Sequence, residues 1–330
     1  MKNFLASILV LLLAVGCFTG CKAGSDPSKD GKFKIVTTIF PEYDWVKSIL
    51  GDNPAKAEIT LLLDKGVDLH SYQPTADDIM KISTCDLFIY VGGESDGWVK
   101  KALQEANNKN MVVINLLEVL GDSVKEEEIV EGMQEEEHDH EDEDHDHEDG
   151  EKEYDEHVWL SLRNAVKLVD SISKGMQKAD ADNAKTYEAN AKAYIEKLKA
   201  LDAEYEKAVT EASVKTVLFG DRFPFRYLTD DYDLKYYAAF VGCSAESEAS
   251  FETITFLSGK VDELGLKAVI TIEGQDHRIA ETIVQNTKEK NQKILTLDSL
   301  QSKTSKDVKN GTTYLSVMEK NLSVLKEALQ

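Results

Sequence analysis

The feature that most constrains the fold is a repeated alternation of short apolar runs with helical segments, which occurs in two blocks of the chain. In each block, β-branched runs of strand length precede segments with the periodicity of a helix. The runs of the first block are residues 34–40, 57–63, 86–92 and 111–117, and those of the second are residues 215–219, 234–240, 268–274 and 293–300. Because strands that alternate with helices form parallel sheets with helices on both faces, we expect an α/β fold with two lobes, each a parallel-type sheet flanked by helices.

One long apolar stripe separates the two blocks. Its members recur at steps of three and four residues, which is the spacing of one helix face: Tyr187, Ala191, Tyr194, Leu198, Leu201, Tyr205 and Val209. No glycine or proline interrupts the stripe, and it is longer than a typical helix of about 11–12 residues. We therefore expect a first lobe at residues 34–175, one long linking helix at 176–212 and a second lobe at 213–330.

The N-terminus has the pattern of an export signal. Its apolar run, residues 4–15, is shorter than the roughly 20 residues that a membrane-spanning helix needs. The segment FTGC resembles the lipobox of bacterial lipoproteins, which predicts lipidation of Cys21, and the segment AVGC makes Cys17 the alternative. Residues 1–20 would then be a signal peptide and residues 21–33 a flexible lipidated tether. We expect an exported protein that is lipid-anchored to the outer face of the cytoplasmic membrane.

The negative charge of the chain is concentrated in one segment. Residues 126–156 hold 19 aspartates and glutamates and one lysine, a net charge of −18 out of −23 for the whole chain. The remainder is nearly balanced and has no basic patch, which argues against nucleic acid as a partner. Like charges repel and offer nothing to bury, so we expect a disordered acidic loop at about residues 122–153. Four histidines in this loop would collect metal loosely: His138, His140, His145 and His147.

The two remaining cysteines, Cys85 and Cys243, lie far apart in apolar surroundings. Neither belongs to a CxxC motif or to another zinc-type spacing, which argues against cysteine ligation. We expect both to be buried free thiols, with a disulfide between them as the alternative in an exported protein.

Two histidines and one carboxylate stand where a cleft at the strand ends is expected, which is where ligands bind to a parallel sheet. His70 comes after the run at 57–63, His157 begins the helical segment after the acidic loop, and Glu273 lies near the end of the run at 268–274. Two imidazoles and a carboxylate suit zinc, and less strongly manganese or iron. Each residue also has an ordinary structural alternative: a histidine can cap a helix, and Glu273 can pair with Arg278 or Arg222.

Several segments are similar to those of the metal-specific substrate-binding lipoproteins of ABC transporters, the zinc and manganese uptake family. They are GVDLHSYQPTADDI, DEHVWLSLRNA, SAESEASFETI, LTLDSL and TYLSVMEKNLSVL. The resemblance covers essentially the whole mature chain and extends to the lipobox and the acidic histidine-rich insertion. It implies two α/β lobes joined by a rigid helix, and a metal site formed by His70, His157 and Glu273.

The resemblance also implies a function. The protein is expected to be a monomer that captures a divalent metal, Zn²⁺ with Mn²⁺ as the alternative, and delivers it to an ABC permease and its ATPase. It would not be an enzyme. Two other functions stay open: an exported zinc hydrolase, against which the absence of HExxH, GxSxG and CxxC motifs argues, and a metal-binding surface adhesin or buffer.

One position departs from the family pattern. The segment RFPFRY places Arg222 where the family has its third histidine, and a guanidinium has no lone pair to give to a metal. Four explanations remain. Asp221 supplies an oxygen ligand, His277 substitutes, or the site keeps three protein ligands and a water while Arg222 pairs with a carboxylate. In the fourth, Arg222 binds the anionic part of a different ligand.

Overall fold

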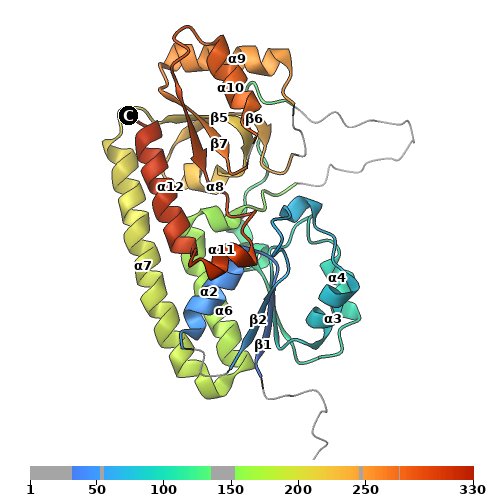
Figure 1. Cartoon of the computed structure of the whole chain (residues 1–330). Helices are drawn as coiled ribbons and strands as arrows, with labels where there is room; N and C mark the ends of the chain where they lie inside the picture. Colours follow the sequence, from blue (N-terminus) through green and yellow to red (C-terminus); the bar gives the residue numbers. More distant parts are fainter. Residues whose placement is uncertain (1–31, 53–55, 135–152, 245–247, 275) are drawn as a thin grey trace, which may run out of the picture. The chain divides into compact units, whose positions relative to one another are not determined.

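The computed structural model describes residues 32–52, 56–134, 153–244, 248–274 and 276–330 (Figure 1). Its first sheet has four parallel strands in the order β2-β1-β3-β4. The strands are β1 (Lys34–Thr37), β2 (Glu58–Leu61), β3 (Leu87–Tyr90) and β4 (Val112–Asn115). The helices of this lobe are α2 (Phe40–Leu50), α3 (Ala76–Thr84), α4 (Val99–Gln104), α5 (Leu116–Leu120) and α6 (Leu162–Ala179).

The second sheet repeats this arrangement with four parallel strands in the order β6-β5-β7-β8. The strands are β5 (Thr216–Phe223), β6 (Lys235–Val241), β7 (Ala268–Ile272) and β8 (Lys293–Leu297), and the helices are α8 (Arg226–Asp231), α9 (Phe251–Leu264), α10 (Arg278–Asn286), α11 (Ser305–Lys309) and α12 (Tyr314–Ala328). The expected α/β fold with two parallel-type sheets flanked by helices is confirmed.

Helix α7 (Ala184–Glu211) lies between the two sheets in the chain and packs against α2, α6 and α12 (Figure 1). Its buried residues are the seven members of the apolar stripe identified in the sequence: Tyr187, Ala191, Tyr194, Leu198, Leu201, Tyr205 and Val209. One apolar core therefore runs from the first lobe along α7 into the second, while a smaller core fills the face of the second sheet under α9 and α10.

The C-terminal segment ties the second lobe back to the first. Thr304 forms an isolated antiparallel bridge with Lys65. At the start of α12, the backbone N–H of Tyr314 donates to the buried carboxylate of Asp44, and its hydroxyl donates to the carbonyl of Trp159 at 2.6 Å. Buried hydrogen bonds of this kind are costly to break because their polar groups lose water on burial. The segment after β8 therefore helps to position the residues near Trp159.

The acidic segment enters and leaves the fold through a short antiparallel stem. Glu126 pairs with Tyr154 across the stem, and the N–H of Asp155 donates to the carbonyl of Lys125. Further along, the N–H of Gln134 donates to the carbonyl of Ala239 on β6. Part of the expected disordered loop is therefore ordered, because its backbone groups pair with residues 153–155 and, at Gln134, with Ala239 of the second lobe.

Several expectations lie outside the described residues. These are the lipidation sites Cys21 and Cys17 and the four histidines of the acidic segment, His138, His140, His145 and His147. Within the part of the chain that the structure describes, no helix has the length and apolar character needed to cross a membrane.

Candidate metal centre

His70 lies on a 3-10 turn, η1 (Leu69–Ser71), that follows β2 and precedes α3. The side chain of Asp68 caps this turn by accepting a hydrogen bond from the N–H of His70 at 3.0 Å. Nδ1 of the His70 imidazole is hydrogen-bonded to Oγ of Ser95 at 2.8 Å. A carboxylate oxygen of Glu156 lies 3.6 Å from the same Nδ1. Two oxygens can therefore hold a proton on Nδ1 and leave Nε2 free to ligate.

His157 is fully buried at the start of the turn η3 (Val158–Leu160). Asp155 accepts two hydrogen bonds from it, one from the backbone N–H at 2.8 Å and one from Nδ1 at 3.0 Å. Gly242 makes room for the ring, since a Cβ at this position would lie 3.0 Å from Cε1 of His157. A carboxylate on one ring nitrogen is the usual partner of a metal-ligating histidine, because it fixes the tautomer and presents the other nitrogen.

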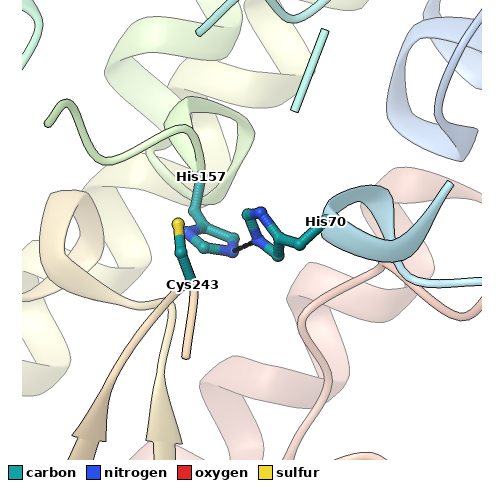
Figure 2. A group of neighbouring side chains, drawn as sticks. All are labelled: His70, His157 and Cys243. Carbon is teal, nitrogen blue, oxygen red and sulfur yellow. Dashed lines mark hydrogen bonds between the residues drawn. The ribbon is translucent and has the colours of Figure 1, made fainter. Parts of the chain in front are cut away.

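The two imidazoles face each other through their Nε2 atoms, which are hydrogen-bonded to each other. Nε2 of His70 lies 3.2 Å from Nε2 of His157, although the two residues come from different segments of the chain (Figure 2). Burial, together with the positive potential of His157, lowers the pKa of His70 to about 4. This imidazole is therefore neutral at neutral pH and keeps the lone pair that a metal requires. Burial opposes the charged form of His157, but Asp155 outweighs it and the pKa of His157 is raised.

Cys243 completes a group of three side chains. One ligand atom from each of His70, His157 and Cys243 lies within 4.8 Å of the others, and Figure 2 shows the sulfur beside the ring of His157. The backbone N–H of Cys243 donates to the carboxylate of Glu127, at 3.3 Å, in the stem of the acidic segment. Burial, with the charge of Glu127, raises the pKa of the Cys243 thiol well above its usual range, so a metal must displace the thiol proton to bind sulfur.

The sequence spacing argued against ligation by Cys243, and the structure places it beside both histidines. The position of Cys243 in the sequence is the signal that could have identified it as a candidate ligand. It comes two residues after the end of β6, at the same sheet edge that drew attention to His70 and Glu273. The other expected free thiol, Cys85, is buried and close to Met111 in the first lobe.

Glu273 does not belong to this group among the described residues. Its carboxylate accepts hydrogen bonds from the N–H of Ser299 at 2.6 Å and from the hydroxyl of Ser299 at 2.8 Å, with Ser302 as a further donor. We expected a cationic partner for this half-buried carboxylate. Hydroxyl and backbone donors stabilise the charge instead, and Arg278 pairs with Asp276.

Asp221 and His277 also lie outside the group in the part of the chain described. The two carboxylate oxygens of Asp221 accept hydrogen bonds from the backbone N–H groups of Arg222 and Ile272. His277 precedes α10, and its Nδ1 is a buried nitrogen without a hydrogen-bond partner among the described residues.

Arg222 lies at the end of β5 and connects two loops that carry site residues. Its Nη2 donates to Asp68, two residues before His70, at 2.9 Å, and its Nη1 donates to the carbonyl of Ser244, next to Cys243, at 3.2 Å. Of the four explanations for this residue, pairing with a carboxylate is the one that matches these contacts. Burial alone would raise the pKa of Asp68, but the positive charge of Arg222 lowers it. The net effect is a lowered pKa, which keeps this carboxylate ionised.

The chain thus forms two α/β lobes, and the donor side chains gather where the lobes meet. The chain belongs to the family described as zinc-uptake complex component A, periplasmic (ZnuA), whose model matches residues 35–328. It is 36% identical over 318 residues to the zinc-binding lipoprotein AdcA of Streptococcus pneumoniae (strain TIGR4), a match that covers 96% of this chain and 60% of that protein. The chain thus spans well under two thirds of that relative.

Two further matches extend over nearly the whole length of the chain compared. The high-affinity zinc uptake system protein ZnuA of Bacillus subtilis (strain 168) is 34% identical over 318 residues, covering 96% of this chain and 94% of that protein. The crystal structure of the zinc-bound ZnuA-like domain of Streptococcus pneumoniae AdcA superposes with a TM-score of 0.69 at 32% identity, covering 91% of this chain and 99% of that chain.

Proposed function

We propose that this protein is an extracellular receptor that captures a divalent metal ion between its two lobes and delivers it to the permease and ATPase of an ABC importer. Zn²⁺ is the proposed cargo and Mn²⁺ the alternative. One observation supports this most strongly: His70 and His157 present their Nε2 atoms to each other at 3.2 Å, while oxygens hold both Nδ1 atoms. Two nitrogens bound to one tetrahedral zinc lie roughly 3.4 Å apart, so the pair needs little rearrangement.

The proposal extends to the location and the working state of the protein. Lipidation at Cys21 would hold the monomer at the outer face of the cytoplasmic membrane, and relatives of this chain are named lipoproteins. The role is binding and delivery, without catalysis. The acidic segment would raise the local concentration of cations near the site, because a dense negative field attracts them.

Zinc binding by the full chain tests this function. His70→Ala should weaken the tightest zinc site at least ~100-fold, since it removes one of few strong ligands. The matched control is His277→Ala, which changes a histidine that lies outside the group. Affinity is measured by competition with a chromophoric chelator. An equal loss of zinc affinity in both variants, or no loss of zinc affinity in His70→Ala, would contradict the proposed site.

A second variant separates the site from the acidic segment. Replacing residues 136–151 by a short Gly/Ser linker removes the four clustered histidines and keeps the stem that contacts Cys243. The tight site should remain, with one zinc bound per chain, because its ligands are held in place by residues outside the replaced segment. Loss of tight binding on this replacement alone would place the main site in the acidic segment.

A further inference from the structure

Cys243 is held in place by contacts from three separate segments. Its backbone N–H donates to Glu127 in the stem, and the next residue, Ser244, offers its carbonyl to Arg222 on β5. On its other side, Gly242 lies against the ring of His157. These contacts fix the backbone at Cys243, so the sulfur occupies a defined position beside the ring of His157 (Figure 2), and one ligand atom from each of the three side chains lies within 4.8 Å of the others.

The contacts of Arg222 show what replaced the family histidine in this chain. The guanidinium cannot ligate a metal, and it points to Asp68 and Ser244, the neighbours of His70 and Cys243. An arginine at this position therefore joins the loop that carries a histidine ligand to the loop that carries the cysteine. Among the described residues of the second lobe, Cys243 is the one whose donor atom groups with the two imidazoles.

We propose that Cys243 is the third protein ligand of the captured metal, so that the site takes zinc through two nitrogens and one sulfur and discriminates against manganese. This inference rests on the proposed metal-binding function and names the donor set of the same site. The thiol gives its proton to solvent as the metal–sulfur bond forms.

The chemistry of this donor set decides the selectivity. Thiolate is a soft ligand that zinc and cadmium accept readily, whereas manganese prefers oxygen donors and is the weakest binder of the divalent series. Zinc–sulfur and zinc–nitrogen bonds measure about 2.3 Å and about 2.0–2.1 Å, so ligand atoms around one zinc lie roughly 3.4–3.7 Å apart. Separations within 4.8 Å can close to these values through small side-chain rotations. Three protein ligands leave one position open, which suits a cargo that must later be released.

Cobalt substitution tests the ligand directly. Co²⁺ bound by a thiolate shows a sulfur-to-metal charge-transfer band in the near ultraviolet, and nitrogen or oxygen ligands give none. The full chain and Cys85→Ala should both show the band with one equivalent of Co²⁺, because Cys85 lies elsewhere in the first lobe. Cys243→Ser should lose it. A band that persists in Cys243→Ser, or is missing from the full chain loaded with Co²⁺, overturns the inference.

Metal affinities give the second readout. Cys243→Ser should lower zinc affinity roughly 100-fold and manganese affinity less than about tenfold, so the preference for zinc falls. Cys243→His should recover most of the zinc affinity without the charge-transfer band, which shows that the fold tolerates a change at this position. Unchanged zinc affinity in Cys243→Ser overturns the sulfur ligand and leaves the proposed function standing. Failure of the unaltered chain to bind zinc at all overturns the proposed function itself.

Discussion

At the scale of single residues, the candidate site depends on the oxygen atoms that contact Nδ1 of each imidazole. Asp155 binds both the backbone and Nδ1 of His157, while Ser95 and Glu156 lie at Nδ1 of His70. Gly93 permits this arrangement, because a Cβ there would lie 2.2 Å from Oε1 of Glu156. The oxygens therefore select the tautomers that direct Nε2 of both rings to a common point.

Asp155→Asn tests this dependence. The amide keeps the size of the side chain, but it is a weaker acceptor and can present its NH₂ group to Nδ1, which favours the wrong tautomer. Zinc affinity should fall about 10–100-fold, the usual cost of losing such a partner. The measurement is chelator competition, with the exposed Asp122→Asn as the matched control. Equal affinities in the two variants would show that Asp155 does not position His157.

At the scale of elements, helix α7 gains its stability from one apolar stripe. Leu198 is fully buried near the middle of the stripe, and Tyr205 further along donates its hydroxyl to the carbonyl of Met318 in α12 at 2.6 Å. Because the stripe packs against helices of both lobes, a defect in it should weaken the whole structure.

Leu198→Ala should lower the free energy of unfolding by about 2–5 kcal/mol, through lost apolar burial and the cavity left behind. Lys197→Ala, at an exposed position one residue away, should change it by less than about 0.5 kcal/mol. Urea denaturation followed by circular dichroism measures both. Similar costs for the two variants would contradict the packing described for α7.

These elements also show what the sequence could and could not predict. The stripe of α7 depends on residues close in sequence, so its periodicity predicts it. The site depends on which strand ends come together across two lobes. His70 and His157 were found through their position and through family segments, whereas Cys243 has no local pattern that indicates a ligand. For Glu273 the position after a strand indicated a ligand, but its carboxylate accepts hydrogen bonds from Ser299. Because Ser299 is remote in sequence, local spacing does not reveal this contact.

At the scale of the whole molecule, Arg222 and Asp68 link the two lobes beside the candidate site. Both side chains are about a quarter exposed, at 22% and 24%, so the ion pair is only partly screened by water. The pair connects β5 of the second lobe with the turn that carries His70. We therefore expect it to slow the opening of the site and the release of metal.

Arg222→Gln and Asp68→Asn should each speed zinc release, by roughly tenfold if the contact contributes about 1–2 kcal/mol. The double variant should release zinc no faster than the faster single variant, because both changes remove the same contact. Stopped-flow transfer of zinc to a chelator measures these rates. Arg278→Gln is the control, since Arg278 is exposed and pairs with Asp276 within its own lobe. If the increases in the zinc release rate multiply in the double variant, a direct contact between Arg222 and Asp68 is contradicted.

The most direct test of the central claim is X-ray absorption at the zinc edge, recorded on the full chain with less than one equivalent of zinc so that the tightest site fills first. The expected ligands are two imidazole nitrogens at about 2.0–2.1 Å and one sulfur at about 2.3 Å. Cys243→Ser should lose the sulfur and keep the imidazoles. A first shell of oxygen with no imidazole scattering would contradict a metal site built on His70 and His157.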